Sequence, residues 1–241
     1  MPLFQLYAMQ TPASIARAAS DGSVAHSIAL SIEAATITAA LAGLLGIPVA
    51  YLLARNEFAG KGLIEAIIDL PLAVPHTVVG IALLFVFGRT GVVGAPVAAL
   101  TGLHFWGSAG GVVVAMLYVG LPYTVGAARE AFRTVDPRLE RVSRTLGAGP
   151  WGAFLRVTIP LAWRGIASGL TMSGARALSE FGAVIILAYY PLTAPVKIYD
   201  LFLEGGLRDS AAASVLFLSI VLALFIALRR LTAAQRLTRR P

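Results

Sequence analysis

Arg176 and Glu180 are the residues best placed to do chemistry, because they interrupt an otherwise apolar stretch, residues 165–189. They are four positions apart and share one helical face, with Ser179 beside Glu180. If the stretch spans a membrane, each charge alone costs about 2.5–3.5 kcal/mol, and pairing turns both toward protein or water. One hypothesis is that the pair lines or gates a translocation path. The alternative is a structural ion pair that holds helices together.

Pro71, Pro75, His76 and Thr77 form a second candidate within the apolar residues 63–88. Each proline removes a backbone donor and disturbs the preceding helical turn. In lipid, the freed carbonyls need partners from other helices, side chains or water, and His76 and Thr77 lie next to the break. A bent helix with polar groups at the bend suits a path or gate. A simple packing kink is the alternative.

Other groupings that would support catalysis are missing from the sequence. The chain has no cysteine, which excludes disulfides and thiolate chemistry. Neither Lys61 nor Lys197 lies in a G-x-x-x-x-G-K-[ST] phosphate loop. The three histidines, at 26, 76 and 104, lack metal-ligand spacing. We therefore expect no enzymatic activity, no metal site and no cofactor in this chain.

The composition predicts an all-α integral membrane protein. Hydrophobic residues make up 58% of the 241 residues, charged residues only 13%, and the mean hydropathy is +0.81. A soluble domain is about 25% charged. Since a membrane helix needs about 20 apolar residues, the chain predicts a bundle of about five spans. These are residues 26–54, 63–88, 109–128, 165–189 and 210–228.

Two other segments are too short to span. Residues 92–103 are apolar but broken by glycine and proline, which predicts a short external or interfacial helix. Residues 1–25 lack the basic start of a signal peptide. We assign them to an external amino-terminal segment, followed by a membrane domain over residues 26–231.

The positions of lysine and arginine predict the orientation. Most of them lie in the loops 55–62 and 129–164 and after residue 228, whereas the other side has only Arg17, Arg89, Lys197 and Arg208. The positive-inside rule places the first group in the cytoplasm, including the basic tail 232–241. The amino terminus is then outside a multi-pass cell-membrane protein. The net charge of +7 is therefore a topology signal, and we expect no nucleic-acid partner.

The longest predicted cytoplasmic loop, about residues 132–163, has the chemistry of a docking segment. Asp136 followed by Pro137 favours a helix start. Gly147 and the pair Gly149–Pro150 predict a break, after which Trp151 and Phe154 are three apart on one helical face. Exposed aromatic residues are plausible anchors for a partner's groove. Interfacial aromatics on the membrane surface are the alternative.

This loop resembles the cytoplasmic coupling segment of ABC importer permeases, often called the EAA loop. The family pattern is Glu-Ala-Ala, three residues, Gly, nine residues and Ile-x-Leu-Pro. Gly147 and Pro160 fall on its fixed points, and Val157 and Ile159 on its apolar positions. Residues 141–143, Arg-Val-Ser, replace the Glu-Ala-Ala triplet.

Three further segments extend the resemblance over most of residues 26–231. Residues 70–84, which contain Pro71 and Pro75, look like the second signature of molybdate, tungstate and sulfate permeases. Arg-Ala-Leu-Ser-Glu-Phe-Gly-Ala at 176–183 looks like the third, and residues 188–195 are similar to the molybdate/tungstate branch. Family members commonly have six spans, and the one without a counterpart here would be at the amino terminus.

The resemblance implies a type I ABC importer permease that forms a homodimeric pore in lipid. Its partners would be two ATP-binding cassette subunits, which carry the ATP and Mg, and an external oxyanion-binding protein. Molybdate or tungstate is the expected cargo, and sulfate or another anion is the alternative. The implied ATPase-coupling residues are Arg144, Gly147, Ala148, Gly149, Pro150, Trp151, Phe154 and Pro160.

A different class of function also fits the residues. A secondary transporter needs no ATPase and would couple transport to protons through intramembrane carboxylates such as Glu33 or Glu180. Recovery of an ATPase with the chain favours the importer, whereas proton-driven uptake by the chain alone favours the secondary transporter.

Overall fold

The computed structural model describes residues 2–234, and every regular element in this range is a helix. Three helices are long and apolar enough to cross a membrane: α3 (Gly22–Arg55), α7 (Ala109–Thr134) and, over residues 207–227, α13 (Leu207–Ala234). Helix α13 therefore extends into the predicted basic tail, of which residues 235–241 lie outside the described range.

The predicted second span is not one helix. It consists of α4 (Lys61–Ala73) and α5 (His76–Phe87), whose axes differ by 118°. The break comes at Val74 and Pro75, while Pro71 is accommodated inside α4. The expected kink is therefore a complete break, and the pair forms either a broken span or a re-entrant loop. A short helix, α6 (Gly94–Thr101), follows as the sequence predicts.

The predicted fourth span is broken too. Helix α10 (Ile159–Leu178) begins earlier than expected and ends just before Ser179. The short helix α11 (Gly182–Leu187) follows, and α12 (Ala194–Gly205) then leads to α13. Although α10 has 20 residues, it is not apolar enough to count among the candidate spans. Length and composition therefore give three spans, or four with the bent pair, in the described range.

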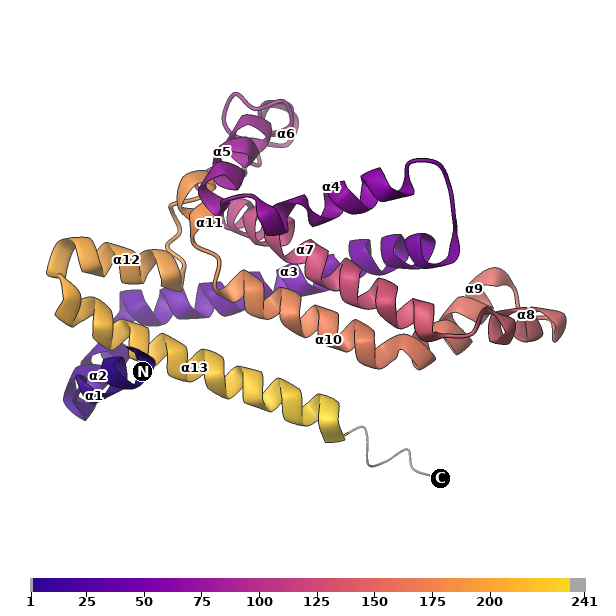
Figure 1. The fold of residues 1–241 in the computed structure, drawn as a ribbon. Coiled ribbons are helices and arrows are strands. Elements are labelled where there is room, and N and C mark those ends of the chain that lie inside the picture. The colour runs from indigo at the N-terminus through magenta and orange to yellow at the C-terminus, as the bar shows by residue number, and fades with distance from the viewer. Residues whose placement is uncertain (1, 235–241) are drawn as a thin grey trace.

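The loop between α7 and α10 folds into short helices beyond one end of the bundle, which we call the loop end (Figure 1). These are α8 (Pro137–Thr145), α9 (Pro150–Ala153) and a π-helical turn, η1 (Phe154–Thr158). Asp136 caps α8 as predicted, because its carboxylate accepts a hydrogen bond from the Arg138 amide at 2.8 Å. Gly147, with φ of +91°, separates α8 from α9 in a conformation that favours glycine.

The amino-terminal segment contains two helices, α1 (Pro2–Ala8) and α2 (Pro12–Ser20). The first span then begins at Gly22 rather than at residue 26. The Tyr7 hydroxyl lies 2.8 Å from Ser219 Oγ in α13. Ser219 is about 18 Å along α13 from Leu207, at 1.5 Å per residue. This amino-terminal segment therefore packs against α13.

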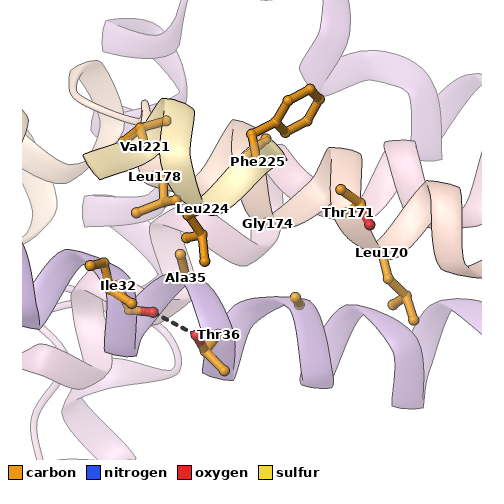
Figure 2. A pocket seen from close by; sticks show the side chains of 12 residues that line it. Ile32, Ala35, Thr36, Leu170, Thr171, Gly174, Leu178, Val221, Leu224 and Phe225 are labelled. Atoms are coloured by element: carbon orange, nitrogen blue, oxygen red, sulfur yellow. Dashed lines mark hydrogen bonds between the residues drawn. The ribbon is translucent and has the colours of Figure 1, made fainter. Parts of the chain in front are cut away.

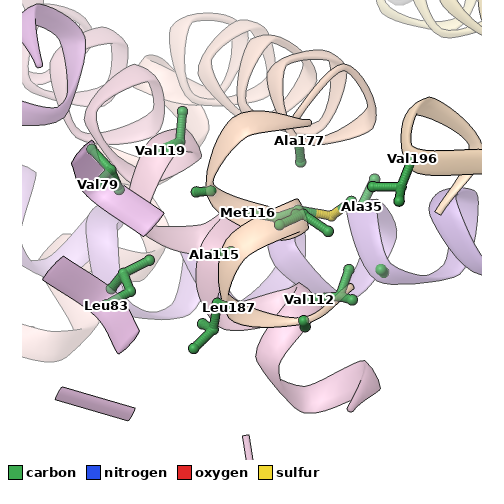
Figure 3. Close-up of a cluster of buried hydrophobic side chains, with 14 of the residues drawn as sticks. Ala35, Val79, Leu83, Val112, Ala115, Met116, Val119, Ala177, Leu187 and Val196 are labelled. Carbon is green, nitrogen blue, oxygen red and sulfur yellow. The ribbon is translucent and has the colours of Figure 1, made fainter. Parts of the chain in front are cut away.

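Helices α3, α7 and α10 pack side by side and form the centre of the bundle (Figure 1). Their contact uses the small residues of α10, because a Cβ on Gly169 would lie 2.9 Å from the Ala127 Cβ and 3.2 Å from the Thr124 Cα. These small residues thus serve packing within the subunit. A second cluster of buried side chains joins α5, α7, α10 and α11 around Met116, Val119 and Leu187 (Figure 3).

Gly169 gives a test of this close packing. We expect Gly169→Ala to lower the free energy of unfolding by about 1–3 kcal/mol, because the added methyl overpacks the α7–α10 contact. Gly126→Ala in α7 is the matched control, since a Cβ there meets no atom within 4 Å. Thermal unfolding in detergent measures both. Equal stability of the two variants would contradict the packing described here.

Candidate functional site

The two breaks meet at a polar cluster formed by His76, Arg176, Ser179 and Glu180. One guanidinium nitrogen of Arg176, Nη2, donates to Glu180 Oε2 at 2.7 Å and lies 2.6 Å from His76 Nε2. The other, Nη1, donates to Ser179 Oγ at 3.2 Å. The structure thus brings together four of the seven residues that the sequence proposes for a path or gate, from segments 100 positions apart.

Glu180 is the most deeply buried member, with a side chain only 1% exposed. Besides Arg176, its carboxylate accepts a hydrogen bond from the Ala183 backbone at 2.9 Å, through Oε1. A buried charge is tolerated only when it is paired and hydrogen-bonded, and both conditions are met here. Glu180 therefore joins the end of α10 to the start of α11 across the break.

His76 takes a defined role in the cluster. A guanidinium group only donates hydrogen bonds, so Nε2 of His76 is the acceptor in its 2.6 Å contact with Arg176, and Nδ1 is the other ring nitrogen. This nitrogen is buried without a hydrogen-bond partner, and it lies 3.7 Å from Glu180 Oε2. His76 thus contacts both members of the Arg176–Glu180 ion pair.

Glycines bring the backbones of the two breaks into contact. A Cβ on Gly182 would lie 2.9 Å from the His76 Cβ, and one on Gly80 would lie 3.0 Å from the Ala183 Cα. Helices α5 and α11 therefore approach as closely as their backbones allow. Such contact fixes His76 relative to Glu180.

The other side of the breaks is open. Thr77 and Ser179 are exposed, as are Leu72 (52%) and Val78 (51%). Irregular backbone at membrane depth is tolerated only against protein or a water-filled cavity, not against lipid. This face therefore needs either water or another protein chain. The Thr77 side chain makes no hydrogen bond to the cluster, and Pro71 is buried inside α4, one turn before the break.

The aromatic pair in the loop divides into an outer and an inner residue. Trp151 is 72% exposed, as a docking anchor would be. Phe154 instead turns inward, where its ring centroid lies 4.6 Å from that of Tyr51 and 6.1 Å from that of Phe132. Of the two rings, only that of Trp151 is free to reach a partner, because Phe154 anchors the loop to α3 and α7.

Glu140 is the residue that sequence reasoning missed. Its carboxylate accepts hydrogen bonds from Tyr51 at 2.9 Å, from Thr158 at 2.9 Å, and from Arg55 at 2.7 and 3.0 Å. Burial disfavours its charged form, but the hydrogen bonds from Thr158, Arg55 and Tyr51 outweigh burial and hold the Glu140 pKa below its usual value. A signal was present, because Glu140 lies directly before the position where the family pattern begins with glutamate.

The outer surface of the loop is apolar and basic. Helix α8 has no fully buried residue. Beyond its end, residues 147–149 form the turn to α9, which begins at Pro150. Ala148 in this turn is half-buried, and Pro160 lies at the start of α10. Exposed apolar side chains cover this surface beside exposed arginines, a mixture typical of protein interfaces. They are Leu139, Val142, Leu146, Trp151 and Leu155, beside Arg138, Arg141 and Arg144.

An apolar pocket of about 280 Å³ lies elsewhere, between α3, α10 and α13 (Figure 2). Its polar side chains, Thr36 and Thr171, donate their hydroxyls to carbonyls of their own helices. This leaves no charged group there to hold an anion. Among the described residues, no group of three potential metal ligands exists either.

Two broken spans that meet at a buried ion pair, next to a bundle with an exposed loop of short helices, define a membrane transport subunit. Comparison with known families agrees. The model of the binding-protein-dependent transport system inner membrane component matches residues 43–237. The chain belongs to this family of ABC importer permeases.

Relatives cover most of the chain. It is 44% identical over 209 residues to the molybdate/tungstate transport system permease protein WtpB of Thermococcus kodakarensis. The matched region is 87% of this chain and 79% of that protein. Identity to WtpB of Pyrococcus furiosus is 42%, over 98% of this chain and 90% of that protein. The Escherichia coli molybdenum transport system permease protein ModB is 37% identical, over 83% of this chain and 88% of that protein.

A solved structure supports the fold. A bacterial ABC transporter that imports the acidic polysaccharide alginate matches with a TM-score of 0.77 at 17% identity, over 97% of this chain and 88% of that chain. The predicted type I importer fold is thereby confirmed.

Trp151 and Phe154 give a test of the loop geometry. We expect Phe154→Ala to lower the free energy of unfolding by on the order of 2 kcal/mol, because it leaves a gap between α3, α7 and η1. Trp151→Ala should change it by less than about 0.5 kcal/mol, since its ring is mostly solvent-exposed. Detergent unfolding of the purified chain measures both. The opposite order of stabilities would contradict the assignment of inner and outer rings.

Proposed function

We propose that this chain is the permease subunit of an ATP-driven importer of molybdate or tungstate. The single observation that carries the geometric side of the proposal is the meeting of two broken spans at the Arg176 cluster, whose open side needs water or a second chain. The assignment of the cargo is supported by relatives at 37–44% identity, which are named as permeases for molybdate, tungstate or molybdenum. Sulfate remains the competing anion.

The partners follow from the same family. A second copy of this chain covers the open side of the breaks, and the path runs between the copies. Two ATP-binding cassette subunits bind the loop end and carry the ATP and Mg, so this chain itself hydrolyses nothing. An external binding protein delivers the oxyanion at the opposite end. A related alginate importer has been solved in complex with a periplasmic protein, which supports this arrangement.

In the proposed orientation, the loop end lies in the cytoplasm and the amino terminus lies outside. The exposed arginines at the loop end support this assignment, since basic residues collect on the inner side. The ATPase subunits would then reach Trp151 and the exposed side of α8. Lipid surrounds the apolar outer faces of α3, α7 and α13.

Transport in this proposal is alternating access. Closure of the ATPase subunits on ATP displaces α8 and α9, and the bundle carries this displacement to the breaks. Arg176 attracts the anion, while Glu180 and His76 hold the guanidinium so that it does not bind tightly. A weak site suits release, and selectivity then belongs mostly to the external binding protein.

Reconstitution of the full complex tests the function. We expect ATP-dependent uptake of molybdate or tungstate into proteoliposomes that contain the permease, the ATPase and the binding protein. Trp151→Ala should abolish copurification of the ATPase because it removes the most exposed anchor of the loop. Phe4→Ala is the matched control, since Phe4 is equally exposed at 74% but far from the loop. Uptake by the chain alone, driven by a proton gradient without ATP, would overturn the proposal.

Arg176→Met tests the path. We expect uptake to fall at least about tenfold, because the variant removes the positive charge that faces the anion and leaves Glu180 to repel it. The double variant Arg176→Met with Glu180→Gln removes both charges. It leaves no unpaired buried charge to destabilise the fold, so a loss of uptake in it reports on transport. Normal uptake by a fully assembled double variant would reduce the cluster to a structural ion pair.

A further inference from the structure

We propose that Glu140 is the positioning residue that makes the coupling helices move as one body with α3, α7 and α10. The inference rests on the proposed function, because it concerns how displacement of α8 and α9 by an ATPase reaches the membrane. It goes beyond that function because it assigns the transmission of this displacement to one side chain, Glu140, which lies outside the matched positions of the EAA pattern.

The first step is where the partners of Glu140 come from. Tyr51 and Arg55 are in the last two turns of α3, and Thr158 is the last residue before α10. Arg55 also donates to the Val135 carbonyl, directly after α7, at 3.0 Å. One carboxylate on α8 thus reaches the loop ends of all three central helices, directly or through Arg55. We call these contacts the Glu140 clasp.

The second step is that α8 has little else to hold it. None of its residues is fully buried, and it is joined to α9 by a turn through Gly147 and Gly149. The connection from α8 to α9 would bend at this glycine turn when pushed. The Glu140 and Arg55 side chains are only 14% and 12% exposed, so the clasp is shielded from water. Charge-assisted hydrogen bonds in such a setting are strong and geometrically specific.

The third step is an aromatic cluster that stiffens the clasp. Tyr51 donates its hydroxyl to Glu140, and its ring packs edge-on against Phe132, with centroids 5.5 Å apart, and against Phe154 at 4.6 Å. The same side chain therefore links the polar clasp to α7 and η1. A push on the outer surface of the loop meets a rigid joint and not a flexible linker.

The clasp stays formed at neutral pH. The pKa of Glu140 lies below its usual value, despite burial, because of the hydrogen bonds from Thr158, Arg55 and Tyr51. A carboxyl with a lowered pKa contributes its stabilisation above the unfolded value and loses it as pH falls through the folded value. Its protonation therefore lies on the acid side of the physiological range, and the clasp acts as a permanent joint.

The test compares two rates in proteoliposomes that hold the whole complex: ATP hydrolysis, and molybdate or tungstate uptake. We expect Glu140→Gln to retain the ATPase subunits and most of the hydrolysis, because the Trp151 surface is intact. The number of anions imported per ATP should fall at least about tenfold. Glu130→Gln is the matched control, since Glu130 pairs with Arg133 at 2.7 Å on the same side but is 62% exposed and outside the clasp.

Milder variants keep the test decisive if Glu140→Gln does not fold. Tyr51→Phe and Thr158→Val each remove one hydrogen bond to Glu140 and retain the shape of the side chain. Each should lower the anions imported per ATP, by less than Glu140→Gln does. A merely structural role lowers ATP hydrolysis and anion uptake in proportion. An unchanged number of anions imported per ATP therefore overturns the inference. If the wild-type complex shows no ATP-driven uptake, the proposed function fails instead.

Discussion

The constraint on which this structure depends is that backbone groups at membrane depth need partners. Helices satisfy their own amides, but the chain breaks twice, at Val74–Pro75 and around Ser179. Both breaks are placed back to back, and Glu180 accepts the Ala183 amide that the second break leaves free, at 2.9 Å. This hydrogen bond requires the Glu180 carboxylate to be buried, and Arg176 neutralises its charge. The candidate path is therefore a consequence of how two broken spans satisfy each other.

Small residues make the arrangement rigid. Gly169 brings α10 against α7, and Gly80 and Gly182 bring α5 against α11, each with backbone or Cβ atoms at contact distance. Close-packed interfaces of this kind have few alternative arrangements and move as units. The loop helices are joined to the same unit by Tyr51, Phe154 and Glu140. In the proposed mechanism, packing along the bundle carries a displacement at the loop end to the breaks.

Local patterns were readable from the sequence, and long-range ones were not. The capping of α8 by Asp136, the turn at Gly147 and the pairing of Arg176 with Glu180 depend on residues a few positions apart. Contacts between distant segments have no such signal: His76 meets Arg176 from 100 positions away, and Tyr51 meets Glu140 from 89. For the same reason, spacing alone placed Trp151 and Phe154 on one face, whereas only the packing of Tyr51 and Phe132 shows that Phe154 turns inward. Hydropathy likewise predicted apolar length but not the breaks that divide it.

The charge balance of the cluster limits what it can do for an anion. The guanidinium of Arg176 bonds to the Glu180 carboxylate at 2.7 Å, which leaves this pair neutral, and His76 lies on the other side of the guanidinium. A net-neutral site offers an anion directional donors but no excess positive charge, so affinity there is low. Low affinity is what a path requires, since an ion that binds tightly is not released. In the proposed path, discrimination between oxyanions of equal charge therefore has to occur before the anion reaches Arg176. The proposal assigns this discrimination to the protein that delivers the anion to the open side of the breaks.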